Sequence, residues 1–130
     1  MIMPKTAAEK LGIKPGDTVM IVNAPQDPPL QGGFPERVTV HHGRGHTEPD
    51  VVVLFAHDST QLHGDAPGLL APLTDAVKVW IAYRKKGVSE LSRDVLMPAL
   101  TGIGWHGVSL VSIDDSWSAA RFRLLEHIGH

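Results

Sequence analysis

Three uninterrupted runs of apolar and β-branched residues limit the folds that this chain can adopt. They cover residues 18–22, 51–56 and 79–83, and the last run belongs to a predicted strand over 78–83 that starts with Lys78. A strand with one face in water alternates apolar and polar residues, whereas a strand covered on both faces is apolar throughout. The three runs therefore predict strands of a mostly parallel sheet that has a covering layer on each face.

Helical patterns separate these strands, as the crossovers of a parallel sheet require. The first predicted helix is short and covers residues 7–11. The second begins at a Ser59 cap and repeats apolar residues every 3.6 positions, and we expect it to be kinked or to end near Pro72. A third is predicted to begin at a Ser92 cap and to bend at Pro98. Its apolar positions are Val95, Leu96, Ala99, Leu100 and Ile103.

The remaining strands are predicted from shorter patterns. Residues 37–41 form a weak strand pattern. Residues 107–113 and 116–124 read as two strands joined by a turn at Asp114-Asp115, which favours an antiparallel pair. The predicted fold class is therefore α/β, with a mostly parallel sheet and an antiparallel C-terminal edge pair.

The length of the chain fits one domain over residues 1–130. Its 42% apolar and 20% charged content is ordinary for a globular protein. Four prolines between residues 24 and 36 favour a loop in place of the first crossover helix. We expect residues 125–130 to form a flexible tail.

Composition also excludes several functions. The chain has no cysteine, which rules out a disulfide scaffold, a thiolate zinc site and a cysteine nucleophile. Its net charge of −2 argues against non-specific binding of nucleic acid, which needs concentrated basic residues. No apolar stretch has the length of a signal peptide or a membrane span, so we expect a cytoplasmic protein without a membrane partner.

Several segments resemble known families. Residues 11–22, Leu-Gly-Ile-Lys-Pro-Gly-Asp-Thr-Val-Met-Ile-Val, resemble the lead-in to the first strand of class I S-adenosylmethionine-dependent methyltransferases. The later strands follow in that family's order. Three segments resemble a family of short bacterial proteins classified as a domain of unknown function: 80–86, 92–94 and 114–123. The resemblance implies a small Rossmann-like fold with a reduced methyltransferase-like topology, and it supplies no activity.

Two positions depart from the methyltransferase pattern. The family closes its first strand with a glycine-rich turn, because the cofactor lies directly on the backbone. Here the turn is Asn23-Ala24-Pro25, which adds side-chain atoms and removes a donor. Where the family places an acidic residue for the ribose hydroxyls, this chain has His41 and His42. Both departures argue against S-adenosylmethionine as a cofactor.

The ligand site of an open α/β sheet lies beyond the carboxyl ends of its strands, where the strand order switches. Ammonium groups beside helix amides suit a small anion. We therefore predict an anion-binding rim, although a solvated basic loop is the commoner use of such lysines. The predicted rim residues are Asn23, His57, Lys85, Lys86, Ser89 and Trp117.

His42 and His46 suggest a second kind of site. The glycine-rich loop between them could bring the two imidazoles together on a metal ion, while the intervening arginine opposes a cation. A polar surface loop is the simpler interpretation. Trp105 lies in a glycine-flanked connection, and exposure of Trp105 or Trp117 would favour a homodimer.

These patterns lead to one functional hypothesis and two alternatives. The leading hypothesis is a non-catalytic domain that binds a small anionic molecule or a protein partner. One alternative is an enzyme, either a divergent S-adenosylmethionine-dependent methyltransferase or another nucleotide-binding enzyme. The other alternative is a histidine-loop metal protein.

Overall fold

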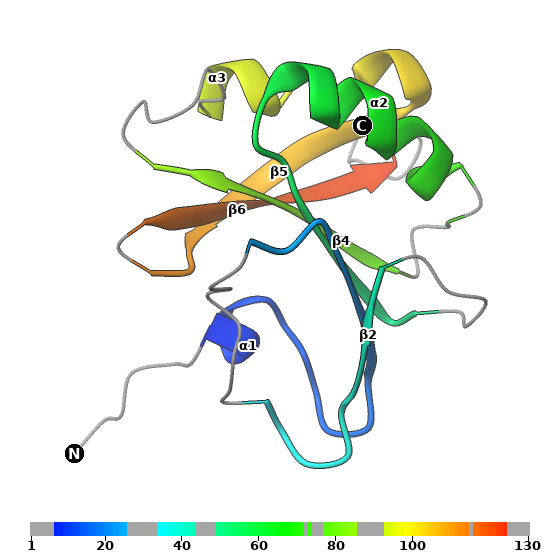
Figure 1. Cartoon of the computed structure of the whole chain (residues 1–130), viewed down its shortest axis with the longest axis vertical. Coiled ribbons are helices and arrows are strands. Elements are labelled where there is room, and N and C mark those ends of the chain that lie inside the picture. The colour runs from blue at the N-terminus through cyan, green and yellow to red at the C-terminus, as the bar shows by residue number, and fades with distance from the viewer. Residues whose placement is uncertain are drawn as a thin grey trace.

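The computed structural model describes residues 7–25, 34–43, 49–71, 73, 77–85, 93–114 and 116–124. These residues form a six-stranded sheet in the order β2-β1-β3-β4-β6-β5 (Figure 1). The strands are β1 (Thr18–Val22), β2 (Thr39–His42), β3 (Val51–Phe55), β4 (Lys78–Arg84), β5 (Trp105–Ser112) and β6 (Trp117–Leu124). The helices are α1 (Ala7–Lys10), α2 (Ser59–Leu70), α3 (Arg93–Leu96) and the 3-10 helix η1 (Thr101–Ile103).

The sheet is mostly parallel, as predicted. Strands β1 to β4 all run in one direction. Strand β6 runs antiparallel to both of its neighbours, β4 and β5, so β5 points the same way as the first four strands. The C-terminal antiparallel pair is therefore confirmed, and β6 is the single reversed strand among those described. β2 lies on one side of β1, and β3, the next strand in the chain, lies on the other side. The strand order therefore switches between β1 and β3.

Each face of the sheet carries its own hydrophobic core, which explains why the central strands β1, β3 and β4 are almost entirely apolar. Helices α2 and α3 cover one face and α1 lies on the other (Figure 1). All five residues of β3 are buried, because their side chains alternate between the two cores. The longest helix of the described residues has 12 residues, and none is long and apolar enough to span a membrane.

Helix α1 is fastened to the sheet by backbone acceptors at its end. Trp80 Nε1 donates to the Leu11 carbonyl at 2.9 Å in a buried hydrogen bond. Lys78 Nζ donates to the Gly12 carbonyl at 2.7 Å. These bonds satisfy carbonyls that a four-residue helix cannot pair internally, and they fix the end of α1 against β4.

Helix α2 begins one residue earlier than predicted. Asp58, not Ser59, is the N-cap, and its carboxylate accepts from the Gln61 amide at 2.7 Å. A carboxylate is a strong cap because it satisfies a free amide and faces the positive end of the helix dipole. The helix tolerates Pro67 and ends at Leu70, close to the expected end near Pro72.

The predicted third helix is much shorter in the structure. It covers Arg93–Leu96, turns follow over residues 97–100, and η1 completes the connection. Proline lacks an amide proton and disfavours helical geometry in the residue before it, so Pro98 ends the helix instead of bending it. As a result Val95 and Ile103, predicted on the apolar helix face, are exposed.

Two further predictions change at the strands. Trp105 begins β5 and is 2% exposed, so the expected exposure of this residue is wrong. Trp117 is also buried, at 3% exposed, which removes the tryptophan-based argument for a homodimer.

Strand β2 begins at Thr39 instead of residue 37, because Arg37 has a φ of 64°, outside the strand region. Most of the proline-rich 24–36 segment and the 125–130 tail lie outside the described residues.

Candidate functional site

Asn23 and His57 meet at the switch point of the sheet. Asn23 follows β1 and His57 follows β3, so both lie beyond the carboxyl ends of neighbouring parallel strands. His57 Nε2 lies 3.3 Å from the Asn23 carbonyl oxygen. A carbonyl can only accept, so this contact assigns a proton to Nε2. Both residues were predicted at the rim, and the structure places them next to each other.

Both residues are positioned by the first turns of α2. The His57 amide donates to Gln61 Oε1 at 2.8 Å, while the Gln61 amide donates to the Asp58 cap. Asn23 Nδ2 donates to Asp65 Oδ2 at 2.7 Å. The cap of α2 therefore fixes the histidine, and the half-buried Asp65 of the same helix fixes the asparagine.

Asn23 also has an unusual backbone conformation. Its φ of 60° lies in the left-handed region, which glycine occupies easily and asparagine more readily than other residues. The first strand thus ends in the left-handed geometry that a glycine commonly supplies, although its residue carries a side chain.

Trp117, the first residue of β6, contacts residues of β3 and β4. Its indole packs edge-on against Phe55 at 5.1 Å and against His57 at 5.8 Å between ring centroids. Arg84 is the cross-strand neighbour of Trp117, and its guanidinium carbon lies 5.1 Å from the indole centroid. We call Asn23, His57, Arg84 and Trp117 the switch-point rim. The tryptophan is buried, whereas Arg84 and His57 are exposed.

Lys85 lies on the other face of the sheet. Neighbouring residues of a strand point to opposite faces, and Lys85 Nζ donates to the Ser112 hydroxyl across β6. Lys10 Nζ donates to the carbonyl of the same serine at 3.0 Å. The predicted rim is therefore divided between two faces of the sheet. Lys86 and Ser89 lie outside the described residues.

The remaining predicted site residues are described only in part. His42 ends β2 and is exposed, and His46 lies outside the described residues. Among the residues that the structure describes, no three histidine, aspartate or glutamate side chains are grouped to hold a metal ion. Asp114 forms the expected turn, because its carboxylate accepts from the amides of Ser116 and Trp117 at 2.8 Å.

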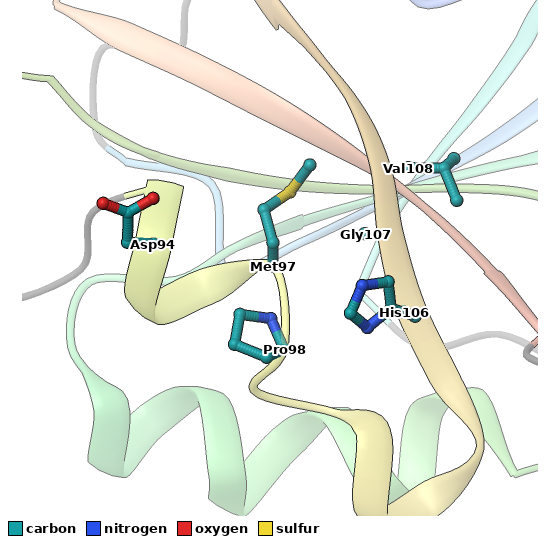
Figure 2. Close-up of a pocket in the computed structure, with 6 residues that line it drawn as sticks. All are labelled: Asp94, Met97, Pro98, His106, Gly107 and Val108. Carbon is teal, nitrogen blue, oxygen red and sulfur yellow. The ribbon is translucent and has the colours of Figure 1, made fainter.

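A separate hollow lies beside β5, at the opposite end of the strands from the rim. Its volume is about 410 Å³, and it opens widely to the surface (Figure 2). The strand pairing gives this position. Gly107, in the wall of the hollow, pairs with Phe122, and Phe122 pairs with Val79 near the start of β4. The lining residues are Asp94, Met97, Pro98, His106, Gly107 and Val108.

Sequence reasoning missed two parts of this arrangement. Arg84 was not included in the predicted rim, although its position next to Lys85 at a strand end was visible. Its stacking on Trp117 depends on the β4–β6 register, which no local pattern encodes. The hollow beside β5 is lined in part by Asp94, Met97 and Pro98 of the interrupted third helix, which the sequence predicted to continue.

The topology and the rim together define a Rossmann-like α/β domain with a candidate ligand site at the switch point of its sheet. Neither a scan against protein-family models nor a search of curated proteins finds a match. Among solved structures, a protein in the NADB-Rossmann superfamily from Streptococcus agalactiae is similar, with a TM-score of 0.49 and 11% sequence identity. The similarity covers 95% of this chain and 69% of that chain.

Proposed function

We propose that this chain is a non-catalytic Rossmann-like domain, with a degenerate methyltransferase-like fold, that binds a small anionic ligand at the switch-point rim. One observation carries the proposal. An exposed guanidinium, that of Arg84, is held over Trp117, and the exposed ring of His57 contacts the same indole. This pair stands at the carboxyl ends of parallel strands, where sheets of this class bind their ligands.

The stacking of Arg84 suits it to recognition of an anion. A guanidinium held over an indole is attracted through its charge, so the contact does not use up its five N–H donors. Its planar fork matches the two oxygens of a carboxylate or a phosphate. Since the buried indole already restrains the side chain, less conformational freedom is lost when a ligand binds.

The rim lacks the parts of a nucleophilic catalyst. Among its four residues none is a serine, threonine, cysteine or lysine that His57 could activate. The Nε2 proton of His57 is directed at the Asn23 carbonyl, which orients the ring without a reacting group between them. These features support binding without chemistry as the function of the rim.

Ligand-induced thermal shifts test the proposal, with inorganic phosphate, acetate and a nucleoside monophosphate as probes. A probe at a hundred times its dissociation constant stabilises the folded state by about 2.7 kcal/mol. We expect Arg84→Met to abolish the shift. Arg121→Met is the matched control, because Arg121 lies over Trp80 at 6.0 Å in a second arginine–tryptophan pair. An equal shift in both variants, or no shift with any probe in the unmodified protein, would refute the anion site.

The left-handed geometry of Asn23 favours a second candidate function. A divergent S-adenosylmethionine-dependent methyltransferase would need this turn to bring the cofactor close to the backbone. S-adenosylmethionine and S-adenosylhomocysteine therefore belong in the same thermal-shift series. Stabilisation by both compounds at micromolar concentration, with no response to phosphate or acetate, would favour this candidate over the anion-binding domain.

A further inference from the structure

The ring of His57 is held in place at the switch-point rim and remains in contact with solvent. The backbone amide of this residue donates to Gln61 Oε1 at 2.8 Å, and the Nε2 proton is directed at the Asn23 carbonyl at 3.3 Å. The ring meets the indole of Trp117 at an interplanar angle of 85°. Because His57 is exposed, its ring can exchange protons with water while these contacts hold its position.

The second ring nitrogen of His57, Nδ1, is the atom whose proton can come and go. Within the part of the chain that the structure describes, the ring makes one hydrogen-bond contact, that of Nε2. In the neutral ring with its proton on Nε2, Nδ1 is an acceptor, whereas both nitrogens donate in the charged ring. Protonation of Nδ1 therefore adds a donor and a positive charge to the rim and leaves the contact with Asn23 intact.

Charged groups surround His57 on three elements, and the end of β1 contributes an uncharged asparagine. On β4, the Arg84 guanidinium lies over the indole that His57 contacts. On α2, the Asp58 carboxylate caps the helix, and the Asp65 carboxylate holds the asparagine of the rim. In the turn before β6, Asp114 accepts from two backbone amides. None of these three carboxylates bonds to the ring, so no ion pair with them fixes its charge.

We propose that His57 is the pH sensor of the rim, and that an anion binds there together with a proton on Nδ1. This inference rests on the proposed anion site at Arg84. The guanidinium carbon of Arg84 lies 5.1 Å and the His57 ring 5.8 Å from one indole centroid, so an anion held by the arginine lies close enough to attract a charged ring. Such coupling is reciprocal, because the anion favours the protonated ring and the protonated ring tightens binding of the anion.

The direction of the pH dependence follows from the charge of the ring. Histidine changes its charge between about pH 5 and 8, and it is positive at the lower end of this range. The affinity of the rim for an anion therefore rises as the pH falls. In the other direction, a bound anion stabilises the charged ring and moves its titration midpoint to a higher pH. The rim holds its ligand in mildly acidic solution and releases it as the pH rises.

Sulfate binding measured by isothermal titration at two pH values tests the proposal on the full chain. Sulfate keeps its charge between about pH 5 and 8, so a change in its affinity reports on the protein. At constant low ionic strength, we expect the sulfate Kd of the unmodified protein to be about fivefold lower at the acidic end, or lower still. His57→Gln keeps a side-chain donor for the Asn23 carbonyl and should lose most of this pH dependence. His63→Gln is the matched control, because His63 is an exposed histidine of α2, and it should retain the dependence.

The outcomes separate the pH sensor from the proposed function. If Arg84→Met abolishes sulfate binding but the Kd of the unmodified protein is the same at both pH values, the anion site stands and the sensor is overturned. The sensor is also overturned if His57→Gln keeps the full pH dependence. Absence of sulfate binding at both pH values would overturn the sensor as well, and the proposed function would then depend on the phosphate, acetate and nucleotide probes.

Proton NMR gives a readout that does not depend on affinity. The ring resonance of His57 is assigned by its absence from the spectrum of His57→Gln. We expect this resonance to titrate at a higher pH with saturating sulfate than without it, because the anion stabilises the charged ring. The ring of His63, in the same spectra, should titrate at an unchanged pH. A His57 midpoint that sulfate does not move, or that it moves no further than the His63 midpoint, would rule out the coupling.

Discussion

Gly107 lies directly against Met97, and its replacement by alanine tests how tightly the 97–100 segment packs on β5. A Cβ atom at position 107 would lie 2.4 Å from Met97 Sδ, 3.0 Å from its Cα and 3.2 Å from its Cβ. The thioether can move away. The Cα cannot move freely, because the Met97 carbonyl accepts from the Gly107 amide at 2.9 Å. We expect Gly107→Ala to lower the free energy of unfolding by about 1–3 kcal/mol, the usual cost of overpacking.

Urea unfolding followed by tryptophan fluorescence, at one fixed protein concentration, measures this loss. A second glycine provides the control. A Cβ atom added at Gly64, in α2, would meet no other described atom within 4 Å, so Gly64→Ala should stabilise the protein by about 0.5–1 kcal/mol through helix propensity. Gly107→Ala should lower the free energy of unfolding by less in a Met97→Ala background than in the parent chain. If Gly107→Ala unfolds at the same urea concentration as the unmodified protein, the close packing is refuted.

Three further substitutions test local features of the fold. Asp58→Ala removes the cap of the Gln61 amide and should lower the unfolding free energy by about 1 kcal/mol, while Asp58→Asn retains most of it in the same urea titration. Trp80→Phe leaves the buried Leu11 carbonyl without its donor, and a loss of about 1–3 kcal/mol is expected in thermal melts followed by circular dichroism. An unchanged melting temperature would contradict the importance of that bond. Asn23→Ala should be less stable than Asn23→Gly by about 1–2 kcal/mol, since both variants lose the side-chain hydrogen bond and only alanine resists a positive φ; equal stabilities would argue against the left-handed conformation.

The strands could be predicted from sequence because burial on both faces leaves a continuous apolar signal. The strands predicted at 18–22, 51–56 and 78–83 correspond to β1, β3 and β4 within one residue. The helix at Arg93–Leu96 was overpredicted for a physical reason. The 3.6-residue spacing continues through residue 103, but Pro98 cannot supply the hydrogen bond that such a helix needs. Periodicity alone therefore gave the wrong length.

The rim was predictable as a location but not as a set of contacts. The rule that ligands lie beyond the carboxyl ends of parallel strands indicated Asn23 and His57, which the structure brings within 3.3 Å. The sequence could not separate Arg84 from Lys85, because their assignment to opposite faces depends on where β4 ends. The stacking of Arg84 on Trp117 joins residues that are distant in the chain, and only the β4–β6 register brings them together.

The position of β6 has a consequence for how the protein forms during synthesis. β6 follows β5 along the chain but lies between β4 and β5 in the sheet. A nascent chain that has not yet released residues 117–124 from the ribosome has no neighbour for β5, and the apolar edge of β4 is uncovered. Sheet assembly must therefore wait for the last strand to emerge and insert between two existing ones, instead of growing outward as translation proceeds. A ribosome stalled before residue 117 would hold an aggregation-prone intermediate, and chaperone contact with β4 and β5 would be expected at that stage.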